Sequence, residues 1–297
     1  MSGVAAECHN EYRPAVSVIV AIYNAEATLP DCLDSLRQLD YPRCRLEVLC
    51  VDNGSTDGTP RLLETYRQQI TILREERRGP AAARNAGLRQ AAGEVIAFTD
   101  SDCAVDRNWL RALVGPLRDP RVGVVGGTIL SKRPCNSIEA FGEQIHDHNR
   151  AVNEFRPPYA ITMNWASRLE VFKTVGFFNE DLLRCSDADL SYRMVQAGYR
   201  LVYAPAAIIY HQNERTPWGL MREGYVHGYH AVNVVRLHRA FLEQVRHERR
   251  EQRERVPDWS ETPNRLPPRP WCDALWFRVF QLGKRIGRLH ASWMTPP

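Results

Sequence analysis

The feature that most restricts the fold is a repeated pair of patterns, in which a short apolar run is followed by a stretch with helical spacing. Nearly uninterrupted apolar runs are typical of strands that are buried on both faces of a parallel sheet. Helical spacing between them indicates crossover helices, so the order predicts an α/β fold with a Rossmann-like, doubly wound sheet. The four runs are Val16 to Tyr23 (VSVIVAIY), Leu46 to Val51 (LEVLCV), Ile70 to Leu73 and Val95 to Thr99.

Polar residues follow three of these predicted strands directly. Asn24 follows the first, Asp52 the second and Asp100 the fourth. In open sheets of this kind, ligands bind beyond the carboxyl ends of the strands. We therefore expect these three residues, which are far apart in the sequence, to meet at one edge of the sheet.

The alternation becomes less regular after Asp102, although further elements can be predicted. We expect strands at Val122 to Leu130, Ala160 to Met163 and Leu201 to Tyr210, which makes a mixed sheet. The helical patterns in this part of the chain are Trp109 to Leu117, Arg168 to Val175 and a helix from Ser186 to Gly198.

Beyond residue 215 the chain is expected to form a helical, basic extension over residues 216–297, in which five prolines between Val256 and Pro270 predict an extended connector. The segment from Trp271 to Trp293 is amphipathic. It can lie on an anionic membrane surface, although packing against the protein itself or a second subunit explains the pattern equally well. The last 33 residues carry seven basic side chains and one acidic one: Arg265, Arg269, Arg278, Lys284, Arg285, Arg288 and His290 against Asp273.

Several classes of protein do not fit the sequence. The eight cysteines are scattered and contain no CxxC pair, which argues against a zinc site or a disulfide framework. No apolar run approaches the about 20 residues that span a bilayer, and the polar tail of residues 1–14 does not resemble a signal peptide. The net charge of +4 is no nucleic-acid signature. We expect a cytoplasmic protein that can also sit peripherally on the inner membrane face.

The tripeptide Asp100-Ser101-Asp102 places two carboxylates directly after a buried strand. Carboxylates with one residue between them can direct oxygen ligands at a Mg²⁺ or Mn²⁺ ion, which in turn neutralises a diphosphate. A strand-end turn with capping acids is the more common use of this pattern when it is taken alone.

Four sequence blocks in a fixed order favour the metal site over the strand-end turn. The blocks VSVIVAIYN, VDNGSTDGT, RGPAAARNAGL and GEVIAFTDSD resemble family 2 glycosyltransferases, which have the GT-A fold. The resemblance covers roughly Ala15 to His211. One departure is Ala21, where the family commonly has proline.

The resemblance implies a role for each matching residue. Asp52 would contact the nucleotide base, above a loop that contains Asn24 and Glu26, and Arg84 would reach the base or the diphosphate. Asp100 would face the ribose and the metal, beside Ser101, and Asp102 would be the principal metal ligand. In some enzymes with this fold a histidine such as His211 completes the metal shell, although a structural histidine is about equally expected.

The family also implies a catalytic base at Asp187, in the sequence Ser186-Asp187-Ala188-Asp189-Leu190. An acidic residue commonly stands where this chain has Ser186, so the match is imperfect, and Asp189 is the second candidate. Capping of the helix, with Ser186 as N-cap, explains the same acids without catalysis. The helix N-terminus is expected to keep Asp187 ionised.

Asn164 and Trp165 precede this helix where the family positions the donor sugar and the acceptor. Trp165 can stack on a sugar ring, although an aromatic side chain in the core is the more common outcome.

Together these features predict an inverting, Mg²⁺- or Mn²⁺-dependent transferase that moves a sugar from a UDP-, GDP- or dTDP-sugar to a saccharide or lipid-linked acceptor. The expected glycosyltransferase domain spans residues 15–215, with a nucleotide-sugar half at about 15–105 and an acceptor half at about 106–215. An oligomer is compatible with the sequence. The alternative is a non-catalytic nucleotide-sugar-binding subunit of a glycan-assembly complex, which only Ser186 favours.

Overall fold

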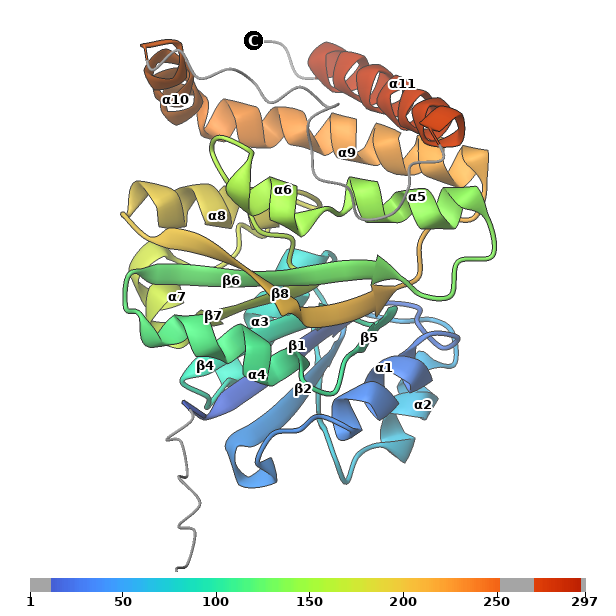
Figure 1. Ribbon diagram of the computed structural model, residues 1–297. Helices are drawn as coiled ribbons and strands as arrows, with labels where there is room; N and C mark the ends of the chain where they lie inside the picture. The colour runs from blue at the N-terminus through green and yellow to red at the C-terminus, as the bar shows by residue number, and fades with distance from the viewer. Residues whose placement is uncertain (1–11, 252–269, 295–297) are drawn as a thin grey trace, which may run out of the picture.

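A computed structural model describes residues 12–251 and 270–294. Its centre is one eight-stranded mixed sheet with the strand order β3-β2-β1-β4-β7-β6-β8-β5 (Figure 1). The prediction of a mixed α/β sheet is therefore confirmed. The strands are β1 (Val16–Ile22), β2 (Leu46–Asp52), β3 (Thr71–Arg74), β4 (Val95–Asp100), β5 (Cys103–Val105), β6 (Val122–Ser131), β7 (Asn164–Arg168) and β8 (Arg200–His211).

Helices cover both faces of this sheet. The apolar side chains of α1 and α4 pack on one face, and those of α3, α7 and α8 pack on the other. The helices are α1 (Leu29–Arg37), α2 (Thr59–Thr65), α3 (Pro80–Gln90), α4 (Trp109–Val114), α5 (Ser137–Ile145), α6 (His148–Asn153), α7 (Leu169–Val175), α8 (Ser186–Gln196), α9 (Pro217–Leu237), α10 (Arg239–Glu251) and α11 (Pro270–Met294).

Strand β1 shows why the apolar runs form a sheet with two covered faces. Val16, Val18 and Val20 belong to the core cluster on one face, whereas Ile19 belongs to the cluster on the other. Successive side chains of a strand point to opposite faces, so an uninterrupted apolar run is stable only where both faces are covered. The helices on the two faces satisfy this condition for β1, which pairs in parallel with β2 and with β4.

The second half of the sheet departs from the predictions in two places. The strand expected at Ala160 to Met163 was wrong, because β7 begins at Asn164 and runs antiparallel to β4. The three-residue strand β5 was not predicted, since so short a segment carries no period that the sequence could reveal.

The C-terminal helices α9 and α11 cross at glycines. A Cβ atom added to Gly228 would lie 2.1 Å from the Lys284 carbonyl oxygen, and one added to Gly287 would lie 2.1 Å from the Tyr225 carbonyl oxygen. Only residues without side chains allow two helix backbones to approach so closely. The predicted helical extension is thus confirmed for its described part, whereas residues 252–269 of the expected connector lie outside it. Among the described helices, none is long and apolar enough to cross a membrane.

Candidate active site at the carboxyl edge of the sheet

The strand register brings the polar strand-end residues together. Asp52 is paired with Ile22 at the end of β1, and Asp100 is paired with Ala21 on the other side of the same strand. On the far edge of the sheet, Cys103 of β5 is paired with His211 of β8. The expected meeting of the strand ends is therefore present, and it includes the histidine.

The loops after β1 and β2 hold each other through the predicted loop residues. The Asn24 side-chain oxygen accepts a hydrogen bond from the Thr56 backbone N–H at 2.8 Å, and the Glu26 carboxylate accepts one from the Gly58 N–H at 3.0 Å. Asn24 has a positive φ of 48°, a conformation that asparagine tolerates better than most residues. Through these hydrogen bonds, the side chains of Asn24 and Glu26 stabilise the loops after β1 and β2.

Asp52 and its neighbour Asn53 hold the loop after β2 and the chain before α3 by hydrogen bonds. Asp52 is buried, and its Oδ1 accepts a hydrogen bond from the Ser55 N–H at 3.0 Å. Asn53 was missed by the sequence analysis. Its amide binds the carbonyls of Glu75 and Arg77 and the N–H of Gly79, which fixes the chain at the start of α3.

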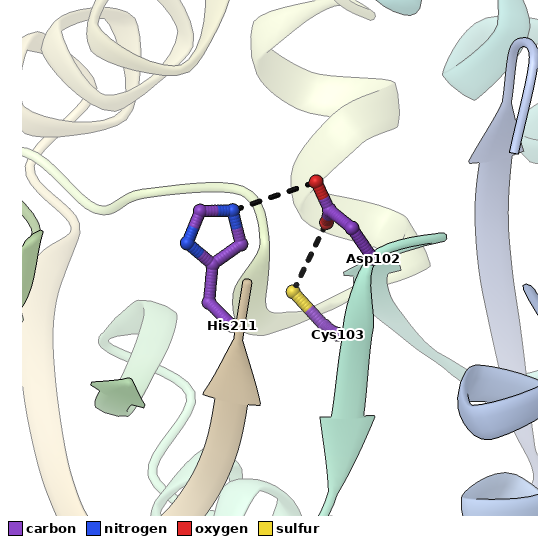
Figure 2. Close-up of side chains that lie close together, drawn as sticks. All are labelled: Asp102, Cys103 and His211. Carbon is purple, nitrogen blue, oxygen red and sulfur yellow. Dashed lines mark hydrogen bonds and ion pairs between the residues drawn. The ribbon is translucent and has the colours of Figure 1, made fainter. Parts of the chain in front are cut away.

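The centre of the site is the pair Asp102 and His211, which come from the turn after β4 and the end of β8 (Figure 2). The His211 Nε2 atom lies 3.5 Å from an Asp102 carboxylate oxygen. The Cys103 thiol lies 3.5 Å from the other oxygen, and the three groups are the cluster of potential metal ligands among the described residues. Burial lowers the His211 pKa, but the adjacent Asp102 carboxylate outweighs burial and raises it to about 9.

Asn213 determines which nitrogen of His211 faces Asp102. The Asn213 Nδ2 donates to the Glu139 carbonyl oxygen at 2.9 Å, and a carbonyl can only accept. The Asn213 oxygen must therefore be the atom that lies 2.7 Å from His211 Nδ1, and that nitrogen must carry the proton. Nε2 is then the nitrogen whose lone pair is available in the neutral ring.

These residues fit a divalent cation. A carboxylate oxygen and an imidazole nitrogen suit Mn²⁺ and leave room for ligands from a diphosphate. Cys103 does not suit this role, because burial and the carboxylates of Asp102 and Asp100 raise the pKa of its thiol, whereas thiols bind metals as thiolates. Asp102 and His211 could hold the ion that the sequence predicts.

Asp100 is near enough to raise the pKa values of Cys103 and His211, although it is not one of the three clustered groups. Its Oδ1 forms an ion pair with Arg84 at 2.9 Å, and the Arg84 side chain is buried beside the ring of Phe178. The ion pair uses one carboxylate oxygen of Asp100, and its expected share in the metal site stays a prediction. Arg84 was expected to face the base or the diphosphate, and it is fixed beside the strand end that carries Asp100-Ser101-Asp102.

Asp187 lies in the first turn of α8, partly shielded from solvent. Burial raises the pKa of its carboxyl group, and the nearby Arg84 partly offsets this effect. Burial is the larger of the two effects, so the pKa of Asp187 is raised although the residue lies at a helix N-terminus. A raised pKa makes the carboxylate a stronger base once it is ionised.

The two flanking residues have structural roles. Ser186 is not the N-cap, because the helix is preceded by Cys185, whose φ of 60° is left-handed. Asp189, the second candidate base, is buried; it forms an ion pair with Arg193 and a hydrogen bond with His238, each at 2.8 Å. Asp189 therefore connects α8 to the end of α9, whereas the acid with an electrostatic interaction with Arg84 is Asp187.

Asn164 and Trp165 cannot touch a sugar in this structure, since both side chains are fully buried. The Asn164 amide binds the carbonyls of Thr128 and Ala207, where the pairing of β6 with β8 is irregular. Trp165 packs in an aromatic cluster that includes Phe98. The expected acceptor contacts are corrected, and both residues belong to the core.

Comparison with known proteins assigns the chain to a family. The profile of Glycosyl transferase family 2 matches residues 17–178, which include β1 to β4, Asp100-Ser101-Asp102 and β7. The chain belongs to this family.

Similar proteins and solved structures agree with the assignment. The glycosyltransferase AglE of Haloferax volcanii is 32% identical over 238 residues, which are 78% of each chain. A pre-mycofactocin glycosyltransferase of Mycobacterium tuberculosis is 30% identical over 67% of this chain, but the match spans only 43% of that relative.

Among solved structures, a mannosyltransferase of Pyrobaculum calidifontis in complex with GDP-mannose and Mn²⁺ has a TM-score of 0.62 and 26% identity. The match covers 96% of this chain and 77% of the mannosyltransferase. A second similar structure is the Staphylococcus aureus TarS fragment 1–349 in complex with UDP-GlcNAc, at 23% identity and a TM-score of 0.56. The match covers 74% of this chain and 66% of that fragment, and it supports the GT-A fold alone. The protein is thus a glycosyltransferase of family 2, with a helical C-terminal region after the sheet.

Proposed function

We propose that this glycosyltransferase transfers a sugar from a nucleoside-diphosphate sugar to an acceptor hydroxyl, with a divalent cation and with inversion at the anomeric carbon. The observation that carries the proposal is the meeting of Asp102 and His211 at the carboxyl edge of the sheet. The structural neighbour with GDP-mannose and Mn²⁺ supports the same type of ligand. Residues 15–105 would supply most of the donor site and residues 106–215 the acceptor side.

Asp102 and His211 would hold a Mg²⁺ or Mn²⁺ ion, which neutralises charge on the leaving diphosphate. Arg84 would keep Asp100 at the strand end through their ion pair, so that Asp100 faces the ribose. Asp52, at the end of β2, would accept a hydrogen bond from the nucleotide base, above the loop that Asn24 and Glu26 stabilise. Ser101, between Asp100 and Asp102, would belong to the same nucleotide-sugar-binding site.

Asp187 would accept the proton of the acceptor hydroxyl as that oxygen attacks the anomeric carbon. The attack and the departure of the diphosphate on opposite sides of this carbon would invert its configuration. The raised pKa of Asp187 supports a base, because proton transfer is most effective when the pKa of the base approaches the working pH.

A donor-cleavage assay tests the proposal. The purified chain is incubated with Mn²⁺ and a panel of UDP-, GDP- and dTDP-sugars, beginning with GDP-mannose, and the released nucleoside diphosphate is measured. We expect Asp102→Asn to reduce release by a factor of about 100 or more, because the variant loses the carboxylate that would hold the cation beside the diphosphate. Asp34→Asn, an exposed acid on α1, is the matched control and should retain activity. Full activity of Asp102→Asn with the preferred donor would contradict the proposal.

The same assay separates the alternative, a nucleotide-sugar-binding subunit without catalysis. Its sequence support is Ser186, which is buried as the first residue of α8. A chain that binds a donor in the presence of Mn²⁺, but releases no diphosphate with any acceptor tested, would favour this alternative.

A further inference from the structure

Helix α11 exposes a stripe of apolar side chains that no other described element covers. Leu282, Leu289 and Trp293 are 51%, 63% and 87% exposed. Leu275 and Ile286 are also exposed, and they continue the same spacing of three, four or seven residues. Residues at these intervals lie on one side of a helix, so the side chains form a stripe about 27 Å long at 1.5 Å per residue.

This stripe is separate from the side of α11 that packs on the protein. Gly283, Gly287 and Ala291 are buried, and the two glycines press against the backbone of α9. Phe280 is buried with Ile138 and Leu220. The helix is therefore already anchored by its inner side, and the exposed stripe adds nothing to the core.

Arginine side chains accompany the stripe. Arg278, Arg285 and Arg288 are exposed on α11. Arg278 and Arg285 are seven residues apart and lie four residues before Leu282 and Leu289, so they lie along one border of the stripe. No acidic residue occurs between Ala274 and Met294. The exposed surface of α11 from Ala274 to Met294 therefore combines apolar side chains with charged side chains that are all basic.

The helical pair adjoins the active-site edge. Glu223 of α9 lies 3.4 Å from His146, and the His146 ring packs against the His211 ring with centroids 5.2 Å apart. In Figure 1, α11 lies outside α9, on the side away from the sheet. Helix α11 is therefore connected to this edge of the sheet through α9.

We propose that the apolar stripe of α11 and its arginines dock the protein on an anionic lipid surface. The apolar side chains would enter the boundary between headgroups and acyl chains, while the arginines would pair with lipid phosphates. A second copy of the chain is a poorer occupant, because two such stripes placed together would bring their arginines into repulsion. This inference does not depend on catalysis, although it would suit the lipid-linked type of acceptor in the proposed function.

Vesicle co-sedimentation tests the docking without any donor or metal. The full chain is mixed with phosphatidylcholine vesicles, or with vesicles that also contain phosphatidylglycerol, at low and high salt. We expect binding to the anionic vesicles, weaker binding at high salt and little binding to phosphatidylcholine alone. Absence of binding to anionic vesicles at low salt would overturn the proposal.

Two pairs of substitutions separate the apolar and the electrostatic contributions. Leu289→Gln with Trp293→Gln should weaken binding about tenfold or more without a change of charge. Arg278→Glu with Arg285→Glu should weaken it at least about fivefold per position, whereas Arg61→Glu on the distant α2 should not. Because all these side chains are exposed, circular dichroism and the unfolding temperature should stay the same.

Two outcomes would contradict the docking surface. Unchanged vesicle binding in both α11 variants would place the lipid contact elsewhere. A concentration-dependent dimer that Leu289→Gln abolishes, together with no vesicle binding, would assign the stripe to a second copy of the chain. Asp102→Asn should leave vesicle binding intact, so failure of the docking and failure of the proposed reaction remain distinguishable.

Discussion

At the scale of single residues, Asn213 controls the chemistry of the site without being a candidate ligand. It holds a proton on Nδ1 of His211, so that Nε2, the nitrogen that faces Asp102, carries the lone pair once the ring is neutral. His211 could be identified in the sequence by the family resemblance, whereas Asn213 could not. The only available signal was a polar residue two positions after the strand end, which many turns also contain.

We expect Asn213→Ala to weaken Mn²⁺ affinity by a factor of about 10 to 100, the usual effect of removing the partner that orients a histidine ligand. Isothermal titration with Mn²⁺ and a bound nucleoside diphosphate measures this. Ser131→Ala is the matched control, because the Ser131 hydroxyl bonds the Asn213 amide and the Glu139 carbonyl oxygen, and not the ring of its strand partner His211. Equal affinities for wild type and Asn213→Ala would refute this role.

His148 makes the fold sensitive to acid. Its Nδ1–H donates to the Gly127 carbonyl oxygen at 3.0 Å, and its Nε2 accepts from the Ile161 N–H at 2.8 Å, so the ring must be neutral. Burial lowers its pKa to about 3 from an ordinary value of 6.5.

The unfolded chain therefore takes up a proton at His148 before the folded chain does. Stability from this residue is fully present above pH 6.5 and is lost between about pH 6.5 and 3, at up to about 1.4 kcal/mol per pH unit. The free energy of unfolding of His148→Gln should fall less steeply over this range than that of wild type, while the exposed His247→Gln should match wild type. Parallel curves for wild type and His148→Gln would show that this histidine does not contribute.

At the scale of elements, the strands buried on both faces could be predicted well, because their apolar runs leave few other possibilities. The limits of β7 could not be predicted. The apolar residues before Asn164 resemble a strand, whereas β7 itself contains Asn164, Ser167 and Arg168. Asn164 can be buried because its amide donates hydrogen bonds to two carbonyl oxygens at the irregular pairing of β6 with β8. Those carbonyls come together only in the folded protein, so the sequence does not show that they need a donor.

The crossing of α9 and α11 gives a prediction at the same scale. Gly228→Ala should destabilise the protein by about 1–3 kcal/mol, because the new methyl group would collide with the Lys284 carbonyl oxygen, although alanine normally favours helices. Thermal unfolding and tryptic release of α11 measure this. Gly115→Ala, where the added atom meets open space, should be neutral. A stabilising effect of Gly228→Ala would mean that the helices do not pack so closely.

At the scale of the whole molecule, the chain combines a catalytic sheet edge with an outer pair of helices. Contacts from Asp102 through His211, His146 and Glu223 connect the two parts. The sequence predicted the ingredients, namely the strand-end acids and the amphipathic tail, but not their connection. His146 lies between α5 and α6, and only the fold brings its ring onto His211.

The central claim is that Asp102 and His211 hold a divalent cation beside a nucleoside diphosphate. Electron paramagnetic resonance of Mn²⁺ measures this directly, since the sharp signal of the free ion diminishes on binding. With GDP or UDP present, the wild-type protein should reduce the signal at concentrations where Asp102→Asn and His211→Gln leave it nearly unchanged. A variant in which both positions are changed, yet which still binds Mn²⁺ as tightly as wild type, would contradict the claim.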